Sequence, residues 1–76
     1  MNMTYNEAIE ILDKIDIAIR TVDIETADKL FDELHDFDCS AYEQFILDLM
    51  IEDMHNRLSM LKWNVKIYNA CSTIYV

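Results

Sequence analysis

The sequence contains no glycine and no proline among its 76 residues. Average usage of roughly 7% and 5% would give about nine of the two together. Glycine-rich phosphate loops and tight hairpin turns are therefore disfavoured. Where a turn needs a positive φ, asparagine or aspartate must supply it, because these residues tolerate the left-handed region better than other non-glycine residues. The absence favours helices joined by short polar junctions.

Basic residues are scarce: six Lys and Arg stand against fifteen Asp and Glu, for a net charge of −9. All the acids lie between Glu7 and Asp53, so residues 1–53 carry −12 and residues 54–76 carry +3. An acidic surface repels nucleic acid and anionic membranes and attracts basic protein surfaces. We expect no direct nucleic-acid binding and no membrane contact. The alternative is that the acids only keep the protein in solution.

Long apolar runs are also missing. The richest run, at residues 45–51, contains Asp48 and is too short to span a bilayer. The amino terminus lacks the charged and apolar pattern of a signal peptide. These features predict a cytoplasmic protein, in the host cytoplasm if a phage encodes it. Cys39 and Cys71 are then expected as reduced thiols, with a bridge between them as the alternative.

Short polar signals mark where helices begin. Thr4 and Glu7 match the capping box, in which each side chain accepts a hydrogen bond from the other residue's backbone amide. Ser40 and Glu43 repeat this pattern, and Asp23 is able to cap a helix between them. The sequence therefore predicts helices over residues 5–22, over 24–36, and over 41–63 or longer.

Apolar residues recur at intervals of three and four within each predicted helix, which is typical of one buried face. The expected core includes Ala8, Leu12, Ile15, Ile19 and Val22, then Ala27, Leu30, Phe31 and Leu34, then Leu47, Met54, Leu58 and Leu61. We predict an all-α fold with a single domain over 1–76, a small three-helix bundle with a long third helix. Segment 64–76 stays open, because its β-branched and aromatic residues suit a frayed end, a fourth helix or a strand.

The third helix is expected to extend past the other two. If it ran to about residue 68 it would be roughly 42 Å long, against about 27 Å and about 20 Å for the first and second helices. Its overhanging end would carry Met60, Trp63, Ile67 and Tyr68. These side chains predict a homodimer or a partner contact, unless the helix breaks near Asn64. A second apolar line runs along the same helix and is interrupted by Asp53 and Asn56; it comprises Tyr42, Phe45, Ile46, Leu49, Met60, Trp63 and Ile67.

Two carboxylate–histidine pairs, Asp32 with His35 and Glu52 with His55, have the spacing that helical bundles use to hold two metal ions. Antiparallel packing of the second and third helices would separate the two histidines by roughly 21 Å along the axis, so we predict no metal site. Cys39 near His35 is a weak nucleophile candidate, because surrounding acids raise a thiol pKa and nothing supplies an oxyanion hole. We expect no enzyme, no catalytic residue and no cofactor.

Residues 34–39, LHDFDC, are interpreted as a junction between helices and not as a site. His35 and Asp36 are expected as the last residues of the second helix, and Phe37 is expected to close the core there. Asp38 and Cys39 would make the turn into the third helix.

Carboxylates are expected to form a partner-binding acidic face. Asp28, Asp32 and Asp36 would repeat about every 6 Å along one side of the second helix. The full predicted face comprises Glu10, Asp13, Asp16, Glu25, Asp28, Asp32 and Asp36. A row of carboxylates can substitute for phosphates, whose charge dominates nucleic-acid binding. The leading hypothesis is a non-enzymatic inhibitor, of the phage anti-CRISPR or anti-restriction type, that occupies a basic nucleic-acid-binding surface of a protein partner.

Two other functions remain open. A homodimeric helical adaptor or structural protein would use the apolar carboxyl-terminal segment. An immunity protein or antitoxin would also be acidic and helical, and would differ in the identity of its partner.

Overall fold

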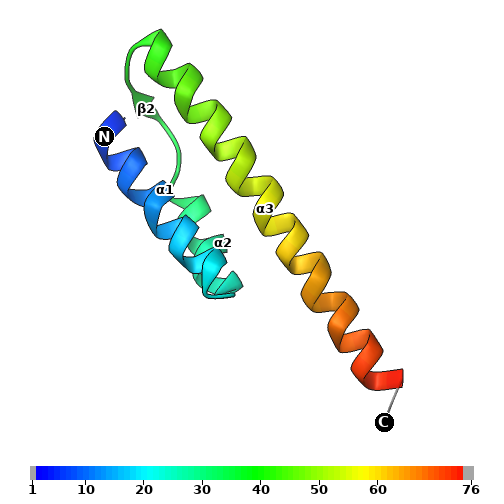
Figure 1. Ribbon diagram of the computed structural model, residues 1–76. Helices are drawn as coiled ribbons and strands as arrows, with labels where there is room; N and C mark the ends of the chain where they lie inside the picture. Colours follow the sequence, from blue (N-terminus) through cyan, green and yellow to red (C-terminus); the bar gives the residue numbers. More distant parts are fainter. Residues whose placement is uncertain (1, 75–76) are drawn as a thin grey trace.

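A computed structural model describes the backbone of residues 2–74 and the side chains of residues 2–70. The elements in chain order are β1 (Met3–Thr4), α1 (Tyr5–Arg20), α2 (Ile24–Asp32), β2 (Phe37–Asp38) and α3 (Ala41–Ile74). The helices α1 and α2 form an antiparallel hairpin, and α3 runs beside it and beyond it (Figure 1). The predicted all-α, three-helix architecture with a long third helix is confirmed.

Local side-chain hydrogen bonds begin the helices as predicted. The Thr4 hydroxyl accepts from the Glu7 amide at 3.2 Å, and the Glu7 carboxylate accepts from the Thr4 amide at 3.1 Å. Ser40 and Glu43 make the same reciprocal pair at 3.2 and 3.0 Å. Asp23 accepts from the amide of the third residue of α2 at 3.3 Å. Each of these bonds satisfies an amide that has no partner inside its helix.

The end of α1 falls two residues before the predicted position. Thr21 follows the helix as its C-cap, and its hydroxyl donates to the Ile17 and Ala18 carbonyls at 2.9 and 3.2 Å. Val22 then turns the chain with φ of 58°. A β-branched residue in the left-handed region is strained, and here it takes the position where glycine is usually found. Val22 is 55% exposed, so its prediction as a core residue was wrong.

The end of α2 was also predicted wrongly. The helix stops at Asp32, so His35 and Asp36 lie in the following loop, and Asp36 does not continue the row of Asp28 and Asp32. Asp36 has φ of 55°, the left-handed conformation that the lack of glycine assigns to aspartate. Phe37 does pack against the core, but from the strand that follows this loop and not from the helix end.

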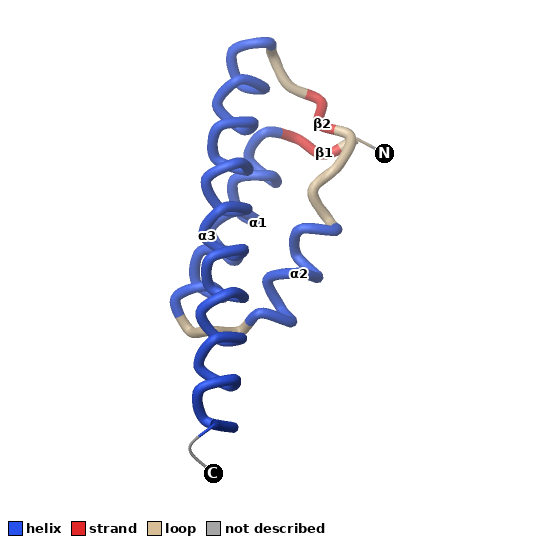
Figure 2. The backbone as a smooth tube through the Cα atoms, turned by 90° about the vertical axis from the view of Figure 1, so that its right-hand side faces the viewer, coloured by secondary structure: helices blue, strands red, loops and turns tan. Residues whose placement is uncertain are grey.

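Strand pairing explains why α2 ends early. β2 lies parallel to β1 with Met3 opposite Phe37 and Thr4 opposite Asp38, and the Met3 amide donates to the Asp36 carbonyl at 2.8 Å. Figure 2 shows the two short strands side by side at the amino-terminal end of α1. Backbone groups that would have formed hydrogen bonds within a longer α2 form them with β1 instead. Asp38 therefore belongs to a strand and not to the predicted turn.

The core is centred on α1, which buries Leu12 and Ile15 completely. Leu47 and Leu58 are buried from α3, and the small side chain of Ala27 lets α2 approach closely. The predicted core residues Leu30 and Phe31 of α2, and Leu34 in the loop after it, are only partly buried. Among residues 2–70, the buried residues are Ala8, Leu12, Ile15, Ala18, Ile19, Ala27, Leu47 and Leu58.

The helix α3 is continuous through Asn64 and ends at Ile74, so the proposed break near residue 64 is absent. Its 34 residues span about 51 Å, close to the 53 Å longest dimension of the molecule. α1 has 16 residues and spans only about 24 Å, so the carboxyl-terminal end of α3 overhangs, as predicted (Figure 1). No helix within residues 2–74 is both long enough and apolar enough to cross a membrane.

Candidate functional site

The structure distributes the seven predicted acidic residues over more than one side of the molecule. Asp16 lies where α1 meets α3. Asp28 and Asp32 line a groove between α2 and α3, whereas Glu10 lines a different groove, between α1 and the segment that follows α2. The grooves of a three-helix bundle open in different directions, so these acids lie on more than one side of the molecule.

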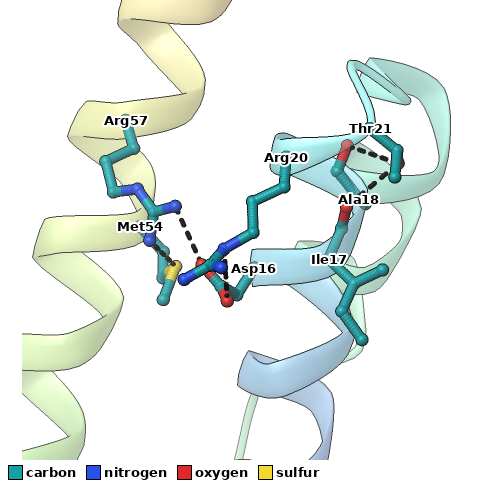
Figure 3. A network of polar contacts seen from close by, with 7 residues as sticks. All are labelled: Asp16, Ile17, Ala18, Arg20, Thr21, Met54 and Arg57. Carbon is teal, nitrogen blue, oxygen red and sulfur yellow. Dashed lines mark hydrogen bonds and ion pairs between the residues drawn. The ribbon is translucent and has the colours of Figure 1, made fainter.

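Asp16 joins the two longest helices (Figure 3). Its Oδ1 atom lies 2.8 Å from Arg57 Nη2, and its Oδ2 atom lies 3.0 Å from Arg20 Nε. Arg57 also donates from Nη1 to the Met54 sulfur at 3.3 Å. The Arg57 guanidinium lowers the pKa of Asp16, Arg20 lowers it further, and burial opposes both. The side chain of Asp16 is only 23% exposed, so this carboxylate stabilises the bundle and presents little charge to a partner.

Asp28 is the second acid that ties two helices together. Lys62 of α3 donates to its Oδ1 atom at 2.8 Å. The pair lies in a groove of about 320 Å³ that also contains Asp32, and His55 meets the Phe31 ring edge-on there at 6.0 Å between centroids. These contacts run from α2 to the middle of α3 and confirm that the two helices are antiparallel.

Two further predicted acids have weak partners. Glu25 lies 3.5 Å from Lys29 on the same helix, and both side chains are more than 75% exposed. Asp36 lies 3.6 Å from the neighbouring His35. Exposed pairs of this kind contribute little to stability, because water and salt screen them. Their carboxylates remain accessible to a basic partner.

Several exposed carboxylates have no hydrogen bond or ion pair within the described residues. They include Glu10, Asp13 and Asp32 of the predicted face and also acids that the prediction did not include. The full set is Glu10, Asp13, Asp32, Glu33, Asp38, Glu52 and Asp53. By contrast, most of the cations are already paired with acids in the same chain: Arg20, Lys29, Arg57 and Lys62. The uncompensated negative charge of these acids is therefore exposed to solvent and to binding partners.

The candidate metal and nucleophile residues do not converge. His35 lies in the loop after α2 and His55 lies in the middle of α3. Among the described side chains, no three His, Cys, Asp or Glu residues gather where they could hold a metal ion. Asp32 and His55 share the groove between α2 and α3, but Glu52 is not among the residues that line it.

Cys39 is half-buried, and its Sγ donates to Gln44 Oε1 at 3.7 Å. Burial raises the pKa of the Cys39 thiol, and the charges of Glu43, Asp38 and Asp48 raise it further. A nucleophilic cysteine needs the opposite, a lowered pKa that populates the thiolate. The suggested bridge to Cys71 involves a side chain outside the described residues.

The predicted apolar contact residues Met60, Trp63, Ile67 and Tyr68 are exposed, with Met60 67% and Trp63 60% accessible. Leu58 is buried in the same part of α3, so the hairpin covers the helix there. Met60 and Trp63 are exposed because they lie on the side of the helix that faces away from the core. The overhang alone therefore does not account for them. The amino-terminal half of α3 exposes Tyr42, Phe45 and Leu49 in the same way. The predicted contact set omitted these three, although their spacing along the second apolar line was visible in the sequence.

No known protein family, curated protein or solved structure matches the chain. Its function therefore has to be inferred from its own residues and geometry.

Proposed function

We propose that this protein is a non-enzymatic inhibitor that binds a basic, nucleic-acid-binding surface of another protein. Phage proteins that block CRISPR or restriction complexes are the type meant. The observation that carries the proposal is the imbalance between exposed carboxylates without partners and cations that are already paired within the chain.

Such an imbalance creates a negative potential around the molecule. Complementary potentials accelerate the encounter of two proteins and select among partners. A surface that binds nucleic acid makes most of its contacts to phosphates through Lys and Arg, so it is a suitable target for clustered carboxylates.

Not every predicted acid is available for this role. Asp16 and Asp28 already bind cations of α3, and losing those contacts would loosen the bundle. The binding role therefore falls to Glu10 and Asp13 on α1, to Glu25 and Asp32 on α2, and to Asp36 in the loop after α2.

Two matched double variants separate the contributions of the two helices. Glu10→Gln with Asp13→Asn removes two charges from α1, and Glu25→Gln with Asp32→Asn removes two from α2. Each tagged protein is used to capture partners from a lysate of the source organism or its host, at low and at high salt. Glu33→Gln with Asp38→Asn is the control, because it removes two exposed charges that lie outside the five proposed binding acids and outside α3.

We expect wild type to retain a nucleic-acid-binding protein at low salt and to lose it at high salt, because exposed charges are screened within a Debye length. At least one of the α1 and α2 variants should retain much less of that partner than the control does. Added nucleic acid should compete with wild type for the captured partner. Equal retention by all variants, or retention that does not depend on salt, would contradict the proposal. An immunity protein or antitoxin would use the same surface, and a captured toxin would identify that function instead.

A homodimeric adaptor is the second candidate function. The apolar side chains exposed along α3 favour it, and they are separate from the acids of α1 and α2.

A further inference from the structure

The outer side of α3 carries a row of large apolar side chains that the other described residues leave exposed. At about 100° per residue, the row lies within a sector of about 60°, on the opposite side of the helix from the buried Leu47 and Leu58. Its members are Tyr42, Phe45, Leu49, Met60, Trp63 and Ile67, with exposed fractions of 74, 61, 53, 67, 60 and 44%. Apolar surface of this extent marks an interaction site in a small protein. We call this surface the outer face of α3.

The spacing of the residues along the outer face is nearly symmetric about its middle. Starting from Tyr42, the next members follow after three and four residues; starting from Ile67, they follow after four and three. Two polar residues, Asp53 and Asn56, occupy the gap between the halves. The first member can be paired with the last, the second with the second-last, and so on toward the middle. The midpoint of each pair then lies between residues 54 and 55, or half a residue from that point.

A two-fold axis at this midpoint brings large apolar partners together. An antiparallel second copy would place Leu49 opposite Met60, Phe45 opposite Trp63, and Tyr42 opposite Ile67. Asp53 would face Asn56, whose amide can donate to the carboxylate, and a single polar layer of this kind specifies the register of paired helices. Closed dimers of identical chains use self-complementary surfaces of this type.

Charges beside the outer face favour the same orientation. Asp48 and Glu52 flank the amino-terminal half, and Lys66 flanks the carboxyl-terminal half on the same side, with its Nζ 5.9 Å from the Trp63 ring centroid. In an antiparallel pair with this register, Lys66 of each chain lies about 7.5 Å along the helix axis from Asp48 of the other, within reach of its long side chain. A parallel pair would instead keep the acids of both copies at one end and Lys66 of both copies at the other, so the opposite charges could not meet.

The size of the outer face fits a dimer. Side chains this large and at least 44% exposed contribute on the order of 100 Å² each. The six from each of two copies give about 1,200 Å², the lower end of the range for specific interfaces. We propose that a second copy of this chain covers the outer face of α3 as an antiparallel, two-fold symmetric dimer with Leu49 opposite Met60. This inference does not rest on the acidic surface of α1 and α2.

Complementary charge variants test both the association and its register. Leu49→Lys and Met60→Glu each put a charge against an apolar partner, and each should weaken self-association by about 100-fold. Mixed in equal amounts, the two variants should associate again, because the lysine introduced in one chain would then face the glutamate introduced in the other. Ile17→Lys is the control, since Ile17 is 61% exposed on α1 and lies outside the outer face. Mass is measured by sedimentation from low to high micromolar concentration, with helix content checked by circular dichroism.

We expect wild type and Ile17→Lys to reach twice the 9.0 kDa chain mass, and each single α3 variant to stay at 9.0 kDa with wild-type helix content. A monomeric wild type over the whole range would overturn the proposal, and so would dimeric single variants. Failure of the two variants to associate when mixed, while wild type does dimerise, would overturn the antiparallel register.

Discussion

Asp16 of α1 and Arg57 of α3 form an ion pair with 2.8 Å between Oδ1 and Nη2, although 40 residues separate them in the chain. The Oδ1 atom is shielded from solvent, and the Arg57 guanidinium is the group that compensates its charge. Arg20 holds the other carboxylate oxygen from the same helix as Asp16. This ion pair therefore connects α1 directly to α3.

Loss of Arg57 should destabilise the fold more than loss of Lys62. Arg57→Met leaves the shielded oxygen of Asp16 without its cation, and we expect the melting temperature to fall by about 5 °C. Lys62→Met breaks a pair whose side chains are 47% and 50% exposed, and should lower it by less than about 2 °C. Thermal unfolding followed by circular dichroism measures both. Equal falls in melting temperature for the two variants would show that the Asp16–Arg57 pair contributes no more stability than the Asp28–Lys62 pair.

Stability should fall in acid partly through Asp16. The contacts with Arg57 and Arg20 lower the pKa of Asp16 below its ordinary value of 3.8, so the unfolded chain binds the proton more readily than the folded chain does. The stabilisation is therefore complete above pH 3.8 and is lost as the pH falls through the folded value. Asp16→Asn removes it at every pH. Urea unfolding between neutral pH and pH 3 should show a steeper loss for wild type than for this variant, and parallel curves would contradict the assignment.

Replacing Val22 by glycine should stabilise the protein. A β-branched residue at φ of 58° costs about 1–2 kcal/mol relative to a permissive residue, and Val22 is too exposed to recover that through burial. Glycine also raises the conformational entropy of the unfolded chain, which offsets part of this gain. We therefore expect Val22→Gly to increase the free energy of unfolding by about 1 kcal/mol. Thr21→Gly is the control and should destabilise, because Thr21 has φ of −94° and its hydroxyl caps two carbonyls. A loss of stability in Val22→Gly would show that its strain is compensated by packing.

The Cys39 thiol should react slowly in the folded protein. Its pKa is raised by burial and by neighbouring carboxylates, so little thiolate is present at neutral or mildly alkaline pH. In a Cys71→Ser background, modification by a thiol reagent should be slower than in urea by at least about tenfold. Asp38→Asn with Asp48→Asn should raise the folded-state rate. Equal rates in the folded and unfolded chains would contradict this description.

Local chemistry made the helix starts predictable. The capping boxes at Thr4 and Ser40 lie within four residues of the amides they bond, so no distant contact is needed to recognise them. The apolar intervals identified Ala8, Leu12, Ile15 and Ile19 correctly, because one helix face must be buried wherever the helix packs.

Contacts between residues far apart in the sequence determined the features that were predicted wrongly or left open. The end of α2 depends on β2 pairing with β1, two segments more than thirty residues apart and each too short to show a strand pattern. The partition of the acids depends in the same way on which cations α3 brings close, and no spacing rule within one helix indicates that Asp16 and Asp28 would be paired across helices.

By itself, the sequence determined that this chain is helical, where each helix begins, which face of each is apolar, and that its charge is strongly negative. Those properties follow from interactions between residues close together in the chain. The tertiary structure decided which carboxylates are held by cations, and that the apolar row of α3 lies outward over its whole length. Both depend on how separate helices cross, because a carboxylate is neutralised, or an apolar side chain covered, only by groups that packing places beside it.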